Sequence, residues 1–146
     1  VAEDVMIELA RSADGETLAS LNALIPQLSS SARPLEVGDL KKLIDDDNIS
    51  LLLARDRNGE ISGTLTLVTF SIPTGIRAII EDVVVDGQKR GMSIGAKLVD
   101  FALDLALSLG AKTVDLTSRP DRESANRLYL RKGFQIRETN VYRFSF

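Results

Sequence analysis

The sequence predicts a single α/β domain in which helices cover a mixed sheet. Three observations predict this class. Two apolar runs, at residues 49–55 and 61–70, flank the turn-forming tetrapeptide Asp-Arg-Asn-Gly, as in an antiparallel hairpin. Residues 79–110 have the pattern of an apolar strand, a glycine-containing turn and an amphipathic helix in immediate succession. Strand and helix patterns continue to alternate after residue 110, as they do in α/β folds.

A strand and two helices are expected before the hairpin. Residues 5–10 alternate apolar and polar side chains, and Asp14 stands where the N-cap of a leucine-rich helix is expected. A polar break containing Pro34 separates this helix from a shorter one at 37–47. The aspartates at 45–47 point in different directions on a helix, so we expect a solvated helix end rather than a metal site.

The elements after the hairpin complete the expected order β-α-α-β-β-β-α-β-α-β-β. A strand ending at Val85 completes a meander, and Gly110 ends the long helix that follows it. Because that helix joins them, the next strand at 112–117 should lie parallel to the strand before the helix. Residues 121–132 are then expected to form a helix, and 134–146 two final strands.

Composition excludes several classes of function. With 146 residues and a net charge of −3, the chain is expected to be one domain over 1–146 that binds no nucleic acid. It has no apolar run that could span a bilayer and no signal-peptide pattern, so we expect a cytoplasmic protein without a membrane partner. Cysteine and histidine are both absent, which removes thiolate nucleophiles, Ser-His-Asp triads and most zinc sites. Acid–base chemistry would fall to Glu, Asp, Tyr, Lys or water, and no metal is required.

The turn Q-K-R-G-M-S-I-G-A-K, which begins at Gln88, is the candidate anion-binding site. A helix N-terminus presents unpaired N–H groups and a partial positive charge, and glycines let a phosphate approach the main chain. Lys89 and Arg90 add formal charge. The alternative is that Gly91 and Gly95 serve only a tight connection and close packing beside an exposed basic pair. The spacing matches neither the dinucleotide-binding fingerprint nor the phosphate loop of NTPases.

Two sequence blocks carry a family resemblance. The block V-V-V-D-G-Q-K-R-G-M-S-I-G-A-K-L at 83–98 is similar to a strand followed by [QR]-x-x-G-x-[GA]. The block A-N-R-L-Y-L-R-K-G-F at 125–134 is similar to A-x-x-L-Y-x-x-x-G-F. In this order the chain resembles, over nearly its whole length, the GNAT superfamily of acyl-CoA-dependent N-acetyltransferases. The resemblance implies the fold predicted above, acetyl-CoA as cosubstrate, and an amine of a small molecule or peptide as acceptor.

The resemblance also implies where the coenzyme binds. The main chain of Val83 and Val85 would hydrogen-bond the pantetheine arm, and residues 88–96 would surround the pyrophosphate. The implied coenzyme-binding residues are Val83, Val85, Gln88, Lys89, Arg90, Gly91, Ser93, Gly95 and Ala96. Two positions depart from the family pattern: Ser93 replaces a usual glycine, and Arg122 replaces a frequent asparagine. Asn126 does not align with that asparagine, so no coenzyme role is carried over to it.

Tyr129 stands at the general-acid position of the family that the chain resembles. A phenol with a pKa of about 10 can donate a proton to the departing CoA thiolate. Considered without the motif, a helical tyrosine would more often make an aromatic core contact. The chain has no cysteine, and no serine lies beside a base, which fits direct transfer without a covalent protein intermediate.

Glu81 is the first candidate for the base that frees the lone pair of the amine. Strand alternation places it on the face of Val83, with Asp82 on the opposite face. The alternative is a structural ion pair of these carboxylates with Arg77 or Arg119.

Other functions stay open beside the acetyltransferase. Ser93 and Arg122 motivate a catalytically silent acyl-CoA-binding regulatory module, and the scaffold could also serve as a purely structural or interaction domain. The resemblance implies that the acceptor pocket lies between the first two helices and the last two strands, but no substrate is assigned. An exposed apolar edge on the C-terminal strands would favour a homodimer.

Overall fold

The computed structural model describes residues 5–89 and 93–146. Its strands are β1 (Met6–Leu9), β2 (Ile49–Arg55), β3 (Ile61–Ile72), β4 (Gly75–Val85) and β5 (Val114–Asp115). Its helices are α1 (Gly15–Leu28), α2 (Val37–Asp45), α3 (Ile94–Ser108) and α4 (Glu123–Arg131), with a short 3-10 turn η2 (Gly87–Lys89) before α3.

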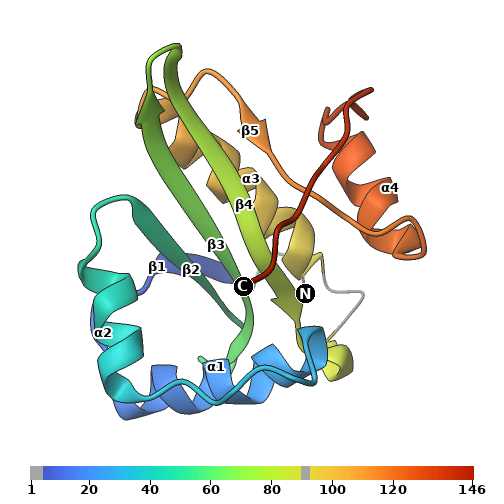
Figure 1. Ribbon diagram of the computed structural model, residues 1–146. Helices are drawn as coiled ribbons and strands as arrows, with labels where there is room; N and C mark the ends of the chain where they lie inside the picture. The colour runs from blue at the N-terminus through green and yellow to red at the C-terminus, as the bar shows by residue number, and fades with distance from the viewer. Residues whose placement is uncertain (1–4, 90–92) are drawn as a thin grey trace.

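The strands form one mixed sheet in the order β1-β2-β3-β4-β5. Strands β1 to β4 pair antiparallel, and β5 is parallel to β4. Figure 1 shows α3 behind this sheet, and α1 and α2 beside the lower part of β2 and β3. The mixed α/β sheet that the sequence predicts is therefore confirmed.

Each face of the sheet is covered, and each has its own hydrophobic core. Leu52 and Ala54 of β2 pack on the α3 side, whereas Leu51 and Leu53 pack with the helices α1 and α2. Because successive side chains of a strand point to opposite faces, a continuous apolar run such as 51–54 belongs to a strand that is covered on both sides.

The local signals at helix ends and turns are confirmed. The Asp14 carboxylate accepts a hydrogen bond from the backbone N–H of Thr17 at 2.8 Å and so caps α1. Gly110 ends α3 with a φ of +87°, which favours glycine. In the β2–β3 turn, the Asp56 carboxylate accepts hydrogen bonds from the backbone N–H groups of Asn58 and Glu60.

Several boundaries differ from those expected. The hairpin of β3 and β4 is longer than predicted, since β3 continues to Ile72 and β4 already begins at Gly75. Strand β5 is shorter, because only Val114 and Asp115 pair with β4. Because β5 is so short, most of β4 has no neighbouring strand on that side.

The prediction of two final strands at 134–146 is wrong for this structure, in which the segment forms no helix or strand. After the Phe134 N–H, which donates to the Tyr129 carbonyl, no backbone hydrogen bond holds the segment among the described residues. Large apolar side chains are consequently exposed at Ile136, Val141, Tyr142, Phe144 and Phe146. The physical reason is that alternating apolar and polar side chains only give a segment one apolar face. A strand forms only when its backbone N–H and C=O groups also pair with a neighbouring strand.

Candidate active site

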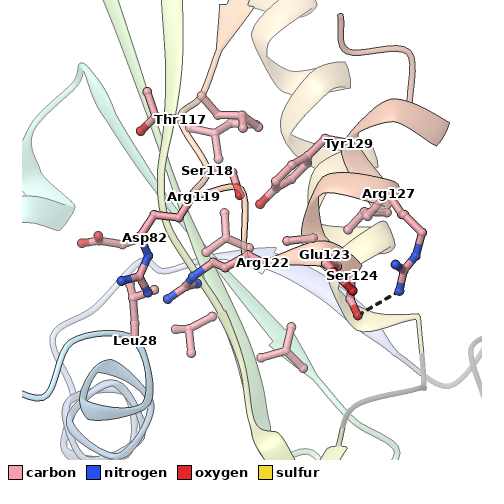
Figure 2. A pocket seen from close by; sticks show the side chains of 18 of the residues that line it. Leu28, Asp82, Thr117, Ser118, Arg119, Arg122, Glu123, Ser124, Arg127 and Tyr129 are labelled. Carbon is pink, nitrogen blue, oxygen red and sulfur yellow. Dashed lines mark hydrogen bonds between the residues drawn. The ribbon is translucent and has the colours of Figure 1, made fainter. Parts of the chain in front are cut away.

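The candidate site lies where the sheet splits. Strand β4 pairs with β3 along its length but with β5 only at Ala78 and Ile79. A cavity of about 1230 Å³ lies at this opening (Figure 2). Its walls come from β4, the end of α1, the start of α3, the β5–α4 connection and α4. This volume exceeds that of an ordinary small-ligand pocket, which is a few hundred to about 1,000 Å³.

A β-bulge shapes the β4 wall of the cavity. The β3–β4 register shifts between Thr64 and Thr66, and Asp82 of β4 has a φ of 49°, in the left-handed region that a non-glycine residue rarely adopts. Strained backbone of this kind is concentrated at functional sites. The Asp82 side chain is exposed and lines the cavity.

The bulge corrects the predicted face of Glu81. Ile80 and Val83 both pack on the α3 side of the sheet, although they are three residues apart, and Val84 packs on the α1 and α2 side. The extra residue thus reverses the alternation, and Glu81 does not share a face with Val83. Glu81 and Asp82 are both exposed and both line the cavity.

The backbone of Val83 and Val85 is directed toward the open side of β4. The Asp86 N–H donates to the Ser62 carbonyl on β3 at 2.8 Å. In an antiparallel pair, successive residues direct their N–H and C=O groups to opposite sides, so those of Val83 and Val85 point away from β3. Unpaired strand groups of this kind can bind an extended, amide-containing ligand as an added strand.

The N-terminus of α3 forms another wall of the cavity. Ser93, Gly95 and Ala96 line it at the start of a helix of 15 residues, where backbone N–H groups have no partner within the helix. Ser93 has a φ of 60° and makes no side-chain cap. A Cβ at Gly95 would lie 3.4 Å from a methyl group of Leu128 on α4 and 3.9 Å from a methyl group of Val85 on β4, so a larger side chain there would be crowded between these elements.

The remaining predicted coenzyme residues are placed differently. Gln88 and Lys89 belong to η2, and neither is among the described residues that line the cavity. The Lys89 ammonium lies 2.9 Å from the Asp56 carboxylate, which is only 2% exposed. The hydrogen bond from Lys89 lowers the pKa of Asp56 and raises the pKa of Lys89, so the pair fixes the turn before α3 to the β2–β3 turn. Arg90 and Gly91 lie outside the described residues.

Tyr129 projects from α4 into the cavity. Its ring packs edge-on against Phe134, with the centroids 5.8 Å apart, and its hydroxyl points toward β4 (Figure 2). Burial raises the pKa of Tyr129, and the positive charge of Arg122 partly opposes this effect. The phenol is therefore protonated at neutral pH and can donate a proton.

Two arginines of the β5–α4 connection were missed as candidate site residues. In Figure 2, Arg119 and Arg122 both extend toward the side of the cavity where Leu28 of α1 lies. The Arg119 Nε lies 4.0 Å from an Asp121 carboxylate oxygen, a contact between exposed groups. Arg122 is half-buried, and its guanidinium makes no hydrogen bond or ion pair with another described residue.

Asn126 holds this connection in place. Its side-chain N–H groups donate to the carbonyls of Arg119 at 2.9 Å and of Arg122 at 2.7 Å. Asn126 thereby fixes the backbone from which both guanidinium groups extend, and its contacts are structural. A single sequence gives no signal for this role, because it depends on how the loop folds back on α4.

Two further observations concern the described ranges 5–89 and 93–146. Within them, no group of His, Cys, Asp or Glu side chains is arranged to hold a metal ion. None of their helices combines the length and the apolar composition that are needed to cross a membrane.

The model of the acetyltransferase (GNAT) family matches residues 17–134, so the chain belongs to this family. Members of the family use acetyl-CoA as cosubstrate, and the chain is an acyltransferase. The family resemblance that the two sequence blocks predict is confirmed.

Two relatives act on phosphorus-containing amines, according to their names. The chain is 34% identical over 140 residues to the aminoalkylphosphonate N-acetyltransferase of Salmonella typhimurium, a match that covers 91% of this chain and 89% of the relative. It is 34% identical over 74 residues to the glucosamine 6-phosphate N-acetyltransferase of Arabidopsis thaliana, covering 49% of this chain and 50% of that protein.

Solved structures support the fold. An aminoglycoside acetyltransferase from an uncultured soil sample superposes with a TM-score of 0.85 at 20% identity, covering 99% of this chain and 97% of the other. An acetyltransferase of Trypanosoma brucei superposes with a TM-score of 0.79 at 25% identity and covers 98% and 100% of the two chains.

Proposed function

We propose that the chain transfers the acetyl group of acetyl-CoA to the amine of a small molecule that carries a phosphonate or phosphate group. One observation carries the proposal. A single cavity contains the open edge of β4, the N-terminus of α3, the Tyr129 hydroxyl and two arginines. These are the groups needed to bind an extended thioester, a diphosphate and an anionic acceptor.

The coenzyme would lie along β4 and end at the start of α3. The backbone of Val83 and Val85 would pair with the amides of the pantetheine arm, and the N–H groups at the start of α3 would hold the pyrophosphate. Lys89 would act by fixing the turn through Asp56. The proposed coenzyme residues remain Val83, Val85, Gln88, Lys89, Arg90, Gly91, Ser93, Gly95 and Ala96.

Two side chains of the cavity would move the protons of the reaction. Glu81, directly or through a water molecule, would accept a proton from the ammonium group of the acceptor, which frees the nitrogen lone pair. The nitrogen then forms a bond to the thioester carbon, the carbon–sulfur bond breaks, and the nitrogen releases a second proton to solvent to give the neutral amide. Tyr129 would give its proton to the leaving sulfur, and the nearby Arg122 charge would stabilise the phenolate that results.

The proposed class of acceptor is supported by the positive charge of two arginines in the cavity and by the substrates that the names of the two relatives give. Arg122 is half-buried beside Tyr129 with no carboxylate partner among the described residues, and Arg119 extends from the same connection. Guanidinium groups bind phosphate-type oxyanions through paired charge-assisted hydrogen bonds. The two relatives named above act on an aminoalkylphosphonate and on a sugar phosphate.

The test is a thiol-release assay with acetyl-CoA and two acceptors, 2-aminoethylphosphonate and propylamine, which share a primary amine but not the phosphonate. We expect turnover of the phosphonate to exceed that of propylamine at equal concentration. Arg122→Gln should raise the KM for the phosphonate by about 10-fold or more, because a charged hydrogen bond is lost. Arg11→Gln is the control, since Arg11 is exposed and does not line the cavity.

The outcomes separate the alternatives. Equal turnover of both amines would contradict the phosphonate assignment. An increase in the Kd for CoA in Arg122→Gln, with the acceptor KM unchanged, would assign Arg122 to a phosphate of the coenzyme instead. Binding of CoA without turnover of either amine or of a wider amine panel would favour the silent acyl-CoA-binding module.

A further inference from the structure

Two positive side chains meet at the end of β4 that does not line the cavity. Arg77 of β4 and Lys112, which precedes β5, both contact Thr74 in the turn between β3 and β4. The Arg77 Nη2 donates to the Thr74 hydroxyl at 3.1 Å, and the Lys112 Nζ donates to the Thr74 carbonyl at 3.3 Å. Figure 1 shows this turn at the top of the molecule, with the connection from α3 to β5 beside it. We call Thr74, Arg77, Lys112 and Thr113 the basic cluster, and none of them lines the cavity.

The two positive charges of the basic cluster are not neutralised. Among the residues that the structure describes, neither Arg77 nor Lys112 forms an ion pair, although the whole chain has a net charge of −3. The Arg77 Nε is also buried without a hydrogen-bond partner. Like charges that are held at one turn repel each other, and an anion bound between them would relieve this repulsion.

The polar groups of the basic cluster that remain free are hydrogen-bond donors. The Arg77 guanidinium donates to the hydroxyl of Thr113 at 3.3 Å and to that of Thr74, so each hydroxyl accepts a hydrogen bond and has its own hydrogen left to donate. Lys112 has three N–H donors and uses one of them. Guanidinium, ammonium and hydroxyl donors without a carboxylate are suited to bind a phosphate-type oxyanion.

The basic cluster lies at the closed end of the split sheet, where β4 and β5 pair over only two residues each. Two backbone hydrogen bonds join the strands beside it. The Ala78 N–H donates to the Thr113 carbonyl at 3.0 Å, and the Lys112 N–H donates to the Ile76 carbonyl at 2.9 Å. Arg77 belongs to β4, whereas Lys112 and Thr113 lead into β5. An anion that contacts these side chains would therefore connect the two strands at this short joint.

We propose that the basic cluster is a second anion-binding site, which takes a phosphate-type dianion and thereby strengthens the joint between β4 and β5. A dianion matches the two positive charges, whereas a carboxylate neutralises only one of them. The site is separate from the start of α3 and from the arginines of the cavity, so the inference does not depend on the proposed reaction. A ligand that binds only the folded chain stabilises it, which makes the proposal measurable without an activity assay.

The first test is a titration with inorganic phosphate, followed by NMR of the backbone amides in the presence of saturating coenzyme A. The amides of Thr74 and Thr113 should shift with a common Kd on the order of 1 mM or lower. Arg77→Gln/Lys112→Gln should raise this Kd about 10-fold or more, because two charged hydrogen-bond donors are lost. Acetate at equal ionic strength should bind about 10-fold more weakly than phosphate, since it carries one charge.

A matched control removes the same two charges elsewhere. Arg11→Gln/Lys42→Gln changes two exposed residues outside the basic cluster and should bind phosphate like the wild-type chain. Circular dichroism of both double variants checks that they are folded.

The second test is hydrogen exchange at the joint between the strands. The amides of Ala78 and Lys112 should exchange about 10-fold more slowly at a phosphate concentration of about ten times the Kd, since protection by a bound ligand scales with 1 + [L]/Kd. In Arg77→Gln/Lys112→Gln the same concentration of phosphate should leave both rates unchanged. The glutamine at 112 keeps its backbone N–H, so the comparison uses the same two hydrogen bonds.

Each contrary result overturns the inference. Amides of the wild-type basic cluster that do not shift at about 10 mM phosphate contradict it, as does an unchanged Kd in Arg77→Gln/Lys112→Gln. Equal affinity for acetate contradicts the assignment of a dianion. The titration needs only the wild-type chain, so misfolding of a variant does not protect the proposal. A chain that binds phosphate at the basic cluster but does not bind coenzyme A would contradict the proposed function alone.

Discussion

Strand β4 is closed on one side and open on the other. Against β3 it pairs from Gly75 to Val85, with one bulge, whereas against β5 it pairs only at Ala78 and Ile79. Pairing with β3 fixes the closed side, and side chains of β4 pack into the hydrophobic cores on both faces of the sheet. The open side presents unpaired backbone and a cavity. The candidate site therefore arises where β4, held by β3 on one side, has no neighbouring strand on the other side. The predictions below concern first the open side of β4 and then the turn that connects the closed side to α3.

The largest effect is expected on the open side, for Tyr129→Phe. If the hydroxyl donates a proton to the leaving sulfur, its removal should lower kcat by about 100-fold or more, because general acid catalysis contributes 10²–10⁴-fold. CoA affinity should change little, since the ring and its contact with Phe134 are kept. Steady-state kinetics and calorimetry measure the two quantities.

The second tyrosine of the chain supplies the matched control. Tyr142→Phe removes the same hydroxyl from a residue that is 88% exposed and outside the cavity, so kcat should remain at the wild-type value. If Tyr129→Phe also keeps wild-type turnover, Tyr129 has no part in proton transfer.

Asp56→Asn tests the connection between the closed side and the turn before α3. The buried carboxylate accepts hydrogen bonds from Lys89 and from two backbone N–H groups. Its replacement should lower the free energy of unfolding by about 1–3 kcal/mol, which urea denaturation at pH 7 measures. Asp45→Asn, at an exposed helix pair, should have a smaller effect.

The same pair predicts a pH dependence. Because Lys89 lowers the pKa of Asp56 in the folded chain, the pair stabilises the protein above the pKa of an unfolded aspartate, about 3.9. This contribution is lost as the pH falls through the lower pKa of the folded state. The difference in unfolding free energy between wild type and Asp56→Asn should therefore shrink below about pH 4. A difference that does not change between pH 7 and pH 3 would show that the carboxylate charge does not matter.

The smallest effect is expected for Ser93→Gly at the start of α3. Ser93 has a φ of 60°, which costs a non-glycine residue about 1–2 kcal/mol, whereas glycine loses about 0.5–1 kcal/mol of extra chain entropy. The free energy of unfolding should therefore rise by up to about 1.5 kcal/mol. CoA affinity should not fall, because the backbone N–H is kept. A less stable variant would mean that the serine side chain makes a contact worth more than the strain.

The helix ends, the β2–β3 turn and the buried strand β2 could be predicted from the sequence, because each depends on residues that are close together in the chain. Alternation at 51–54, the turn chemistry at 56–59, the Asp14 cap and the Gly110 stop each act within a few residues. The two blocks of family resemblance identified Tyr129 and the start of α3.

The features around the open side of β4 could not be predicted in the same way, because they depend on contacts between residues that are distant in the sequence. A bulge at Asp82 reverses the face of Glu81, and the length of β5 depends on pairing with a distant strand. Lys89 was expected at a phosphate, but its partner Asp56 lies 33 residues away in sequence. The pattern at 134–146 predicts two strands that the structure does not form, because alternating apolar and polar residues do not specify a neighbouring strand to pair with.

Calorimetric titration of coenzyme A tests the central claim most directly, that the opening beside β4 and the start of α3 bind the coenzyme. The wild-type chain should bind one equivalent, and Gly95→Leu should weaken binding by about 10-fold or more, since Gly95 lines the cavity and a leucine there is crowded between α4 and β4. Gly38→Leu, at a glycine of α2 with nothing within 4 Å of the added Cβ, should bind like wild type. Absence of binding to the folded wild-type chain at millimolar coenzyme A, or equal affinity in Gly95→Leu, would contradict this account.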